Sequence, residues 1–222
     1  MIPLKFFDNV MSLKRIPRSG WITYRISGHD VESVSSHSHS VAVIALMMSE
    51  IIRSRNQEVD LKNVLKMAIL HDLSESLTFD ISKAYLRYLG RKGSLLKARL
   101  ERKAASRILS DLQSKKLAHT FRRAIAEYSS SKTLEARIVH CADALDLLLQ
   151  VIEYERMGYS KVTLDPIWRE TGSKLNKFRL PLANEWFRQL QRVRTGLKRK
   201  RGPGKSRSTT VKRPGYGRLR PE

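Results

Sequence analysis

The sequence predicts an all-α domain followed by a basic tail, and three observations support this prediction. Through most of residues 1–195, apolar residues return every three or four positions, which is the spacing of helices with one buried face. No stretch alternates polar and apolar residues between turn signals, as strands would. Residues 196–222 are rich in Lys, Arg, Gly and Pro and poor in aliphatic residues, so they cannot bury enough apolar surface to fold alone. We therefore expect a helical domain over residues 1–195 and a disordered tail over residues 196–222.

Three apolar stripes define the central helices of this domain. They comprise Val41, Ile44, Ala45, Met48, Ile51 and Ile52, then Leu61, Val64, Leu65, Ala68 and Ile69, and finally Leu134, Ile138, Ala142, Leu145 and Leu149. Asp60 and Ser94 are expected to cap helices at their N-termini. Helix breaks are expected at Gly90, Gly93, Pro166 and Pro181. These signals divide the domain into six to eight helices.

Composition excludes two classes of protein. A single cysteine, Cys141, can form neither an intrachain disulfide nor a thiolate zinc cluster, so the chain is not a disulfide-stapled scaffold. The N-terminus lacks the apolar run of a signal peptide, and the stretch from Ser38 to Ser49 is shorter than the roughly 20 residues of a membrane-spanning helix. We expect a soluble, cytoplasmic protein with no membrane partner.

The charge is strongly positive and unevenly distributed. The chain has 43 Lys and Arg against 21 Asp and Glu, a net charge of +22, which favours contact with polyanions or anionic small molecules. The tail contains the cluster Lys198, Arg199, Lys200 and Arg201. This cluster is interpreted as a nonspecific nucleic-acid attachment, as an import signal in a eukaryotic cell, or as a solvated tail. The basic stretch from Arg87 to Arg123 is either a solvated helix face or an anion-binding surface.

Ionisable residues on the apolar stripes are the candidates for chemistry, because a buried charge needs a partner or a metal. His37 lies one helical turn before the first stripe and on the same face. The pair His71 and Asp72 follows the end of the second stripe. Asp143 lies on the third, with Asp146 one turn further. Each alone is explained by a buried polar contact. Together they supply imidazole and carboxylate ligands from three helices, a set that suits Zn, Mn, Co, Ni or Fe.

Four motifs resemble those of the HD-domain metal phosphohydrolases, and in particular those of the YfbR-like 5′-deoxynucleotidases and their HD-domain relatives. In chain order, they are Leu13–Trp21, similar to L-K-x-x-x-R-x-x-W; Glu32–Ser38, similar to E-[NS]-V-x-x-H-S; His71–Ile81, similar to H-D-x-x-E-x-x-x-G-D-[IL]; and Ala142–Leu145, similar to A-D-x-L. The resemblance covers about residues 5–160.

The resemblance implies an HD-domain helical bundle and assigns roles to individual residues. One divalent cation (Mn, Co, Zn, Mg, Ni or Fe) would be bound by His37, His71, Asp72 and Asp143. Glu75, one helical turn beyond His71, would handle the attacking water, and Asp80 would help to protonate the departing 5′-oxygen. Arg18 would bind the phosphate with its planar guanidinium. Trp21 would either line the sugar or base site or pack at the edge of the domain.

Two positions depart from the family pattern. Phe79 stands where the relatives have Gly, which puts the backbone bend before Asp80 in question, and Ser36 replaces an acidic residue. Two further histidines are near the motifs. His39 lies about 200° around a helix from the first motif histidine and is a poor co-ligand, and His140 is expected in packing.

The activity implied by the resemblance is the metal-dependent removal of phosphate from (deoxy)ribonucleoside 5′-monophosphates. One alternative is an HD-domain phosphodiesterase or nucleoside triphosphohydrolase, and another, from a different class, is a nucleic-acid-binding protein on an HD scaffold. The resemblance also implies a homodimer. Trp168, Trp186 and Phe187 would supply its interface or else complete the core.

Overall fold

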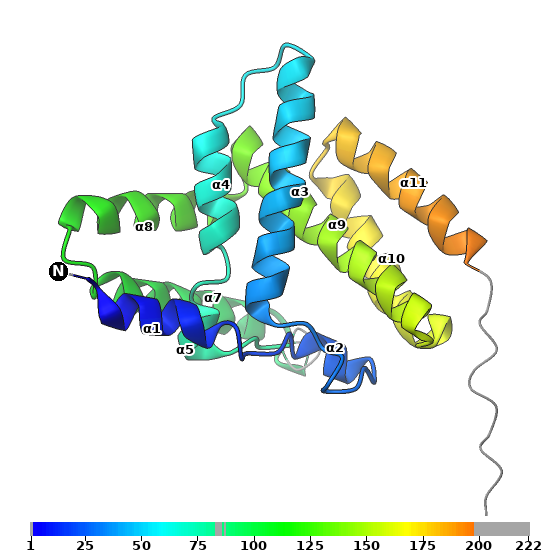
Figure 1. Ribbon diagram of the computed structural model, residues 1–222, viewed down its shortest axis with the longest axis horizontal. Helices are drawn as coiled ribbons and strands as arrows, with labels where there is room; N and C mark the ends of the chain where they lie inside the picture. The colour runs from blue at the N-terminus through cyan, green and yellow to red at the C-terminus, as the bar shows by residue number, and fades with distance from the viewer. Residues whose placement is uncertain (1, 83–85, 87, 198–222) are drawn as a thin grey trace, which may run out of the picture.

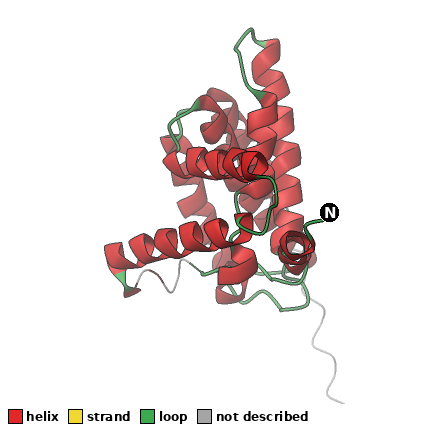
Figure 2. Ribbon diagram, turned by 90° about the vertical axis from the view of Figure 1, so that its left-hand side faces the viewer, coloured by secondary structure: helices red, strands yellow, loops and turns green. Residues whose placement is uncertain are grey.

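The computed structural model describes residues 2–82, 86 and 88–197, and this part of the chain contains helices and no strand (Figure 2). The helices are α1 (Leu4–Ser12), α2 (Gly20–Thr23), α3 (Val34–Ser54), α4 (Leu61–Leu70), α5 (Glu75–Thr78), α7 (Gly90–Leu109), α8 (Lys115–Ser130), α9 (Leu134–Met157), α10 (Lys161–Lys177) and α11 (Pro181–Gly196). The predicted all-α class is confirmed. Lys198, Arg199, Lys200 and Arg201 lie outside the described residues.

The two longest central helices, α3 and α9, pack against each other at the middle of the domain (Figure 1). Helices α4 and α8 lie on one side of this pair, and α10 and α11 lie on the other. Helix α4 runs antiparallel to α3, so the end of α4 lies beside the start of α3. Helices α1, α2, α5 and α7 are gathered at that same end. Residues from the first turn of α3 and from the end of α4 therefore meet there.

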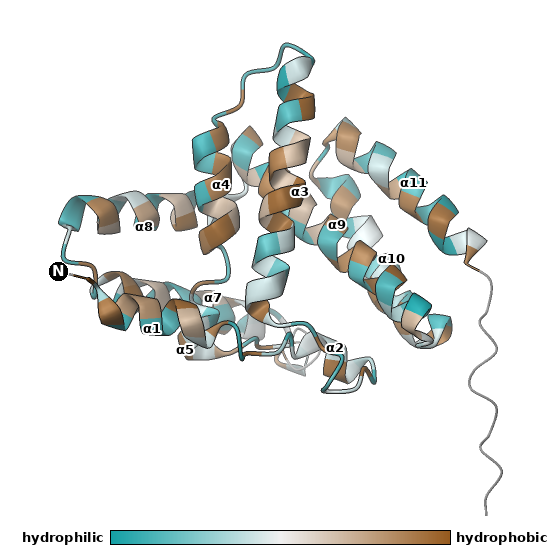
Figure 3. Ribbon diagram, viewed as in Figure 1, coloured by the Kyte–Doolittle hydropathy of each residue, from teal (hydrophilic) through white to brown (hydrophobic). Residues whose placement is uncertain are grey.

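The apolar stripes contribute most of their residues to the core, as the spacing predicts. Val41, Met48, Val64 and Ile138 are fully buried, whereas Ile51, Leu61, Leu65 and Leu134 are partly buried, and Figure 3 shows hydrophobic residues on α3 and α4. Of the residues assigned to the stripes, Ile69 and Leu149 are exposed. Met67 and Leu148 are buried in their place, because a shift of one or two positions turns a side chain away from the core face.

Helix boundaries differ from the sequence expectations at several points. Asp60 caps α4 as expected, its side chain accepting the backbone N–H of Asn63 at 2.9 Å. Ser94 is not a cap, because it lies inside α7. Gly93 also lies inside α7 and does not break it. A Cβ there would come within 2.6 Å of the carbonyl oxygen of Leu86, so this glycine serves a close approach of two backbone segments.

Of the two prolines, Pro181 marks a break between helices as expected, and Pro166 does not. Pro166 lies inside α10, where burial of Leu164, Trp168 and other residues of this helix outweighs one missing backbone hydrogen bond. Pro181 starts α11, a position where its lacking N–H costs nothing. The described residues form ten helices rather than six to eight, because α2 and α5 have four residues each, too few to show periodicity.

The C-terminal aromatic residues complete the core. Trp168 is 6% exposed, its ring lies 5.8 Å from that of Phe187, and Arg194 covers it at 4.5 Å. Phe187 in turn fills the space beside Gly172, where a Cβ would come within 2.3 Å of its ring. Trp186 is partly buried against the core. No helix in the described part of the chain is both long and apolar enough to cross a membrane.

Candidate metal centre and cavity

The first turn of α3 presents His37 to the interior. Ser33 caps this helix by accepting the backbone N–H of Ser36, and the side chain of Ser36 accepts the backbone N–H of Ser33 at 3.0 Å. This is a capping box in which a serine takes the part of the usual acidic residue. The departure from the family pattern at Ser36 therefore leaves the start of α3 intact, with His37 fully buried.

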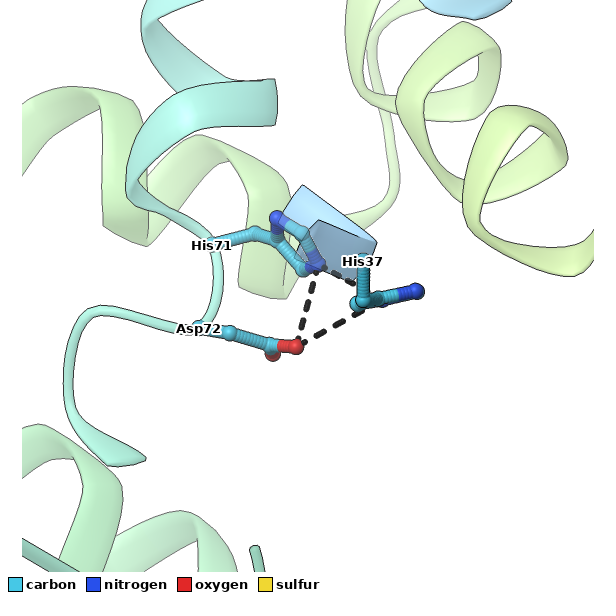
Figure 4. Close-up of side chains that lie close together, drawn as sticks. All are labelled: His37, His71 and Asp72. Atoms are coloured by element: carbon cyan, nitrogen blue, oxygen red, sulfur yellow. Dashed lines mark hydrogen bonds and ion pairs between the residues drawn. The ribbon is translucent and has the colours of Figure 1, made fainter. Parts of the chain in front are cut away.

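The structure brings the four residues of the expected ligand set together. His71 and Asp72 follow directly after α4, and Asp143 comes from the middle of α9. The Nε2 atom of His37 lies 3.4 Å from Nε2 of His71, 3.6 Å from Oδ2 of Asp72 and 3.4 Å from Oδ1 of Asp143. His71 Nε2 lies 3.2 Å from Asp72 Oδ2. Figure 4 shows that His37, His71 and Asp72 converge on one point.

The separations among His37, His71 and Asp72 fit a divalent cation. Ligands bonded to one ion at about 2.1 Å in tetrahedral or octahedral geometry lie roughly 3.0 to 3.4 Å from one another. The separations of 3.2 to 3.6 Å among these three residues match this edge length within a few tenths of an ångström. Asp143 contacts this group through His37, at 3.4 Å. Two imidazoles and two carboxylates are also the donor types that such ions accept. The donor set therefore suits one divalent metal ion.

The outward-facing nitrogens of both histidines are held by hydrogen bonds. His37 Nδ1 lies 2.7 Å from Oδ2 of Asp146, and His71 Nδ1 lies 2.8 Å from the carbonyl oxygen of Ala68. Because a carboxylate and a carbonyl are acceptors, the network assigns the proton to Nδ1 in both rings. Each Nε2 then keeps its lone pair for the cluster, the arrangement usual for metal-bound histidines.

Replacing Asp146 by alanine is expected to weaken metal binding by about 10- to 100-fold, the usual effect of losing a residue that orients a ligand. The His37 ring would lose the contact that fixes its tautomer and rotation. Metal titration of the stripped variant by calorimetry measures the change. Glu153→Ala, an exposed site on the same helix, is the matched control and should leave the affinity unchanged. Unaltered affinity in Asp146→Ala would contradict this role.

The carboxylates around His37 attract a positive charge to the cluster. Burial alone would lower the pKa of His37, but in the metal-free cluster the carboxylates of Asp143 and Asp146 outweigh it and raise this pKa to about 10, so a proton on Nε2 occupies the place that a metal ion would take. Burial would raise the pKa of Asp72, but the charges of His71 and Arg18 hold it below its usual range. The carboxylates thus remain ionised and create a negative potential at the point where the ligand atoms converge.

Glu75 begins the short helix α5 and faces the same point. It is 3% exposed, and its Oε2 lies 3.6 Å from Nη1 of Arg18 without a hydrogen-bond partner. Burial and the neighbouring charge of Asp72 raise the pKa of Glu75 to about 9. A buried carboxyl group with an open oxygen and a raised pKa is suited to exchanging a proton with a bound molecule.

Arg18 and Asp80 lie beside this carboxyl group. Arg18 Nη1 donates to Oδ2 of Asp72 at 3.0 Å, and the Arg18 backbone N–H donates to the carbonyl of Glu32. Asp80 is partly exposed; its side chain accepts the backbone N–H of Gly20 at 3.4 Å. Both residues line the cavity described below. Arg18 therefore lies at the ligand cluster, and Asp80 lies on the cavity wall.

Trp21 and His140 are packed among other side chains, and His39 is exposed. Trp21 is 1% exposed, and its indole Nε1 donates to Glu32 at 2.9 Å; it packs in the core and also lines the cavity. His39 is exposed, as expected of a residue outside the ligand set. The ring of His140 is stacked between Tyr128 and Phe178, with centroid distances of 4.1 and 5.1 Å.

Phe79 adopts the conformation that a glycine would favour at this position. Its φ of +58° and ψ of 169° fall in a region that is populated almost only by glycine. The phenylalanine side chain projects outward, 66% exposed. A backbone conformation suited to glycine is thus adopted here by phenylalanine, which places strain at this residue.

Replacing Phe79 by glycine is expected to raise the free energy of unfolding by about 1 kcal/mol, since relief of roughly 1 to 3 kcal/mol of strain exceeds the entropic cost of glycine. Chemical denaturation measures the change. Phe79→Ala is the matched control, because it removes the same ring but retains a Cβ and should bring no comparable gain. A glycine variant less stable than the parent would contradict the strain.

A cavity of about 490 Å³ opens onto the ligand cluster. One wall carries Arg18, Asp72, Glu75 and Asp80. The opposite wall is formed by residues of α8, α9 and α10, including Tyr128, Leu147, Ile167, Lys174 and Phe178. This size lies within the range of pockets that enclose small organic ligands. The arrangement can hold a phosphate-sized group at the cluster and an organic group in the remaining space.

Two contributors to the site are not apparent from sequence reasoning. Asp146 lies one turn after Asp143, so the spacing places it near the cluster. The spacing alone does not show that its partner is His37. Lys97 also lines the cavity. It is one of seven basic residues on α7, and no sequence signal separates it from the others.

Comparison with known proteins supports this geometry. The HD domain family model matches residues 10–179. The chain is 30% identical to the 5′-deoxynucleotidase HDDC2 of Dictyostelium discoideum, covering 85% of this chain and 96% of that protein. It is 31% identical to the 5′-deoxynucleotidase HDDC2 of Danio rerio over 78% of this chain and 80% of that protein.

Solved structures show the same fold. The PH0347 protein of Pyrococcus horikoshii has a TM-score of 0.69 and 30% identity, covering 86% of this chain and 98% of that chain. An HD-domain phosphohydrolase of Listeria innocua has a TM-score of 0.71 at 20% identity, covering 87% and 89% of the two chains. At that identity, the second likeness concerns the fold alone.

Proposed function

Since this chain belongs to the HD domain family, we propose that it is a metal-dependent phosphohydrolase that removes phosphate from (deoxy)ribonucleoside 5′-monophosphates. The observation that carries the proposal is the convergence of His37, His71, Asp72 and Asp143 at one end of a cavity that also presents Arg18 and Glu75. When bound by these four residues, a divalent metal lowers the pKa of water and polarises a phosphoryl group. The names of the relatives, which are 5′-deoxynucleotidases, support the substrate class.

Arg18 and Glu75 would act on the phosphate and the attacking water. The Arg18 guanidinium remains charged, since carboxylates raise its pKa although burial would lower it, and its fork matches phosphate oxygens. A phosphate held there lies beside Oε2 of Glu75, which is 3.6 Å from Arg18 Nη1. A divalent cation at the neighbouring ligand cluster would lower the raised pKa of Glu75, so that its ionised Oε2 would accept a proton from water as the new bond from oxygen to phosphorus forms.

Asp80 would complete the reaction at the leaving group. As the bond between phosphorus and the 5′-oxygen breaks, the Asp80 carboxyl group would give a proton to that oxygen. Its place is set by the backbone N–H of Gly20 and by the side chain of Ser19, which donates to the Asp80 carbonyl. Glu75 then gains one proton and Asp80 loses one, and exchange of these protons with solvent through the cavity would return both groups to their starting states.

Trp21 is the residue proposed to contact the sugar or base. Its ring orientation is fixed by the hydrogen bond from its Nε1 to Glu32 and by an edge-on contact with Tyr154 at 5.0 Å. A fixed ring on the cavity wall can reject substrates of the wrong shape. Whether it discriminates deoxyribose from ribose is a question for the substrate panel described below.

A nucleoside triphosphatase is the second candidate. The additional phosphates of a triphosphate would need cations besides Arg18. Lys97 and Arg102 of α7, which also line the cavity, would supply them. A phosphodiesterase would use the same groups.

We place catalysis in residues 1–195 and treat residues 196–222, with the cluster Lys198–Arg201, as a separate tail for nonspecific nucleic-acid contact. The alternative of a nucleic-acid-binding protein on an HD scaffold is disfavoured by the complete ligand set.

The proposed homodimer and cytoplasmic location remain predictions. Trp168 is buried, whereas Trp186 and Phe187 are only partly buried, so an interface would use the latter two rather than Trp168. Sedimentation of the full chain at several concentrations tests the dimer.

The substrate panel tests the proposed activity. Metal-stripped protein is given Mn, Co, Mg or Zn in turn and assayed for phosphate release from deoxy- and ribonucleoside 5′-monophosphates, 3′-monophosphates and triphosphates. Release confined to 5′-monophosphates is expected. Hydrolysis of triphosphates alone would favour the second candidate. Absence of release from every compound, with metal bound, would overturn the proposed function.

A further inference from the structure

Two basic residues of α7, Lys97 and Arg102, line the cavity, and Lys97 is the less exposed of the two. The side chain of Lys97 is 19% exposed, whereas Arg99, Arg102 and Lys103 on the same helix are exposed residues. Helix α7 packs against α5, the helix that begins with Glu75, and this packing directs Lys97 toward the ligand cluster. A lysine buried to this extent at a cavity requires charged partners there.

The ammonium group of Lys97 contacts two carboxylates. Its Nζ lies 3.0 Å from Oε1 of Glu101 and 3.8 Å from Oε1 of Glu75. The other oxygen of Glu75 lies 3.6 Å from Nη1 of Arg18. Two cations therefore flank Glu75, one at each oxygen. Burial would lower the pKa of Lys97, but the charges of Glu101 and Glu75 raise it, so the side chain is a cation at neutral pH.

Even with a divalent cation at the ligand cluster, the acidic residues of the site favour a further cation beside Arg18 for phosphate binding. The wall nearest the ligand cluster presents the acidic residues Asp72, Glu75, Asp80 and Asp143. Arg18 is shared with Asp72 at 3.0 Å, so its charge is partly compensated. A phosphate monoester carries close to two negative charges at neutral pH and would be repelled by these carboxylates. Lys97 is the cation placed on the far side of Glu75 from Arg18.

We propose that Lys97 is a second phosphate-binding residue, which contacts the phosphate of the substrate from the side opposite Arg18 and so favours a doubly charged phosphate monoester. This inference rests on the proposed function for the identity of the substrate. The competing interpretation is that Lys97 serves only to pair with Glu101 on the surface of α7. The two interpretations differ in how a substitution at Lys97 should change the affinity for inorganic phosphate.

Binding of inorganic phosphate to metal-loaded, full-length protein tests the proposal directly. Calorimetry should show that Lys97→Met weakens phosphate binding by about tenfold or more, the usual effect of losing a charge-assisted hydrogen bond. Lys97→Arg, which keeps the charge, should restore most of the affinity. The matched control Lys103→Met removes an exposed charge from the same helix and should change the affinity less than about twofold. The KM for a deoxynucleoside 5′-monophosphate should rise in parallel with the loss of phosphate affinity.

A second measurement needs no variant. Phosphate should protect Lys97 of the metal-loaded protein from acetylation by an amine-reactive ester, but should not protect Lys103, as read by mass spectrometry. Unchanged phosphate affinity in Lys97→Met, or equal labelling of Lys97 with and without phosphate, would overturn the proposal. A fall in kcat without loss of phosphate affinity would also overturn it, since Lys97 would then act only through Glu75.

A different result is expected if the proposed function is wrong but Lys97 does bind phosphate. In that case, the parent protein would release no phosphate from nucleotides. Lys97-dependent binding of inorganic phosphate would still be measured.

Discussion

Replacing Asp72 by alanine should abolish both metal retention and phosphate release. Its Oδ2 atom lies within 3.6 Å of both histidine Nε2 atoms and 3.0 Å from Arg18, so the variant would lose a proposed metal ligand and the partner of the guanidinium proposed to bind phosphate. Since metal ions contribute several kcal/mol to such reactions, we expect activity to fall by about 1,000-fold or more. Elemental analysis of the purified variant and a phosphate-release assay measure the two losses.

Asp8→Ala is a suitable control for this experiment because it removes a carboxylate at an exposed position of α1. It should retain metal and activity. His37→Ala should behave like Asp72→Ala, because its Nε2 lies near every other member of the ligand set. Full phosphatase activity with bound metal in either variant would contradict the assignment of the ligands.

Replacing Glu75 by glutamine should separate catalysis from metal binding. Glutamine preserves the size of the side chain but cannot accept the proton from water, so phosphate release should fall by about 100- to 10,000-fold. The metal content should remain at the level of the parent protein, because Glu75 is outside the ligand set. Activity within about threefold of the parent would exclude Glu75 as the proton acceptor.

The same variant gives a pH test in metal-stripped protein. The pKa of Glu75 is raised from 4.5 to about 9, so between these values the folded protein holds a proton that the unfolded chain has lost. This contribution to stability is complete below pH 4.5 and disappears as the pH rises through 9. Between pH 6 and pH 10, the free energy of unfolding of the parent should therefore fall relative to that of Glu75→Gln. Parallel pH profiles for the two proteins would contradict the raised pKa.

The parts of this molecule that sequence could predict are those fixed by periodicity and by local motifs. Burial of His37 follows from its place on the α3 stripe, and the order of the motifs predicts the ligand set because antiparallel α3 and α4 bring residues 37 and 71 to one end. The cap at Asp60 was predictable because it depends only on adjacent residues. In contrast, Pro166 lies inside α10 and Gly93 inside α7, where it is approached closely by the backbone of Leu86, and the rule that such residues break helices does not include these contacts.

The unpredicted parts of the site depend on tertiary contacts. Asp146 holds His37 across 109 positions of sequence, and Lys97 is distinguished from the other basic residues of α7 only by the position of Glu75. The positive φ of Phe79 could not be predicted either, because phenylalanine normally avoids this backbone conformation. Each depends on how helices meet, and spacing within one helix carries no information about that.

A metal titration monitored by catalysis tests the central claim most directly. Stripped protein is supplied with increasing amounts of Mn or Co, and the release of phosphate from deoxyadenosine 5′-monophosphate is measured at each step. If His37, His71, Asp72 and Asp143 form one catalytic metal site, activity should rise in proportion to metal and level off at one equivalent per chain. Activity that is independent of added metal, or that never appears although one equivalent is bound, would contradict the account.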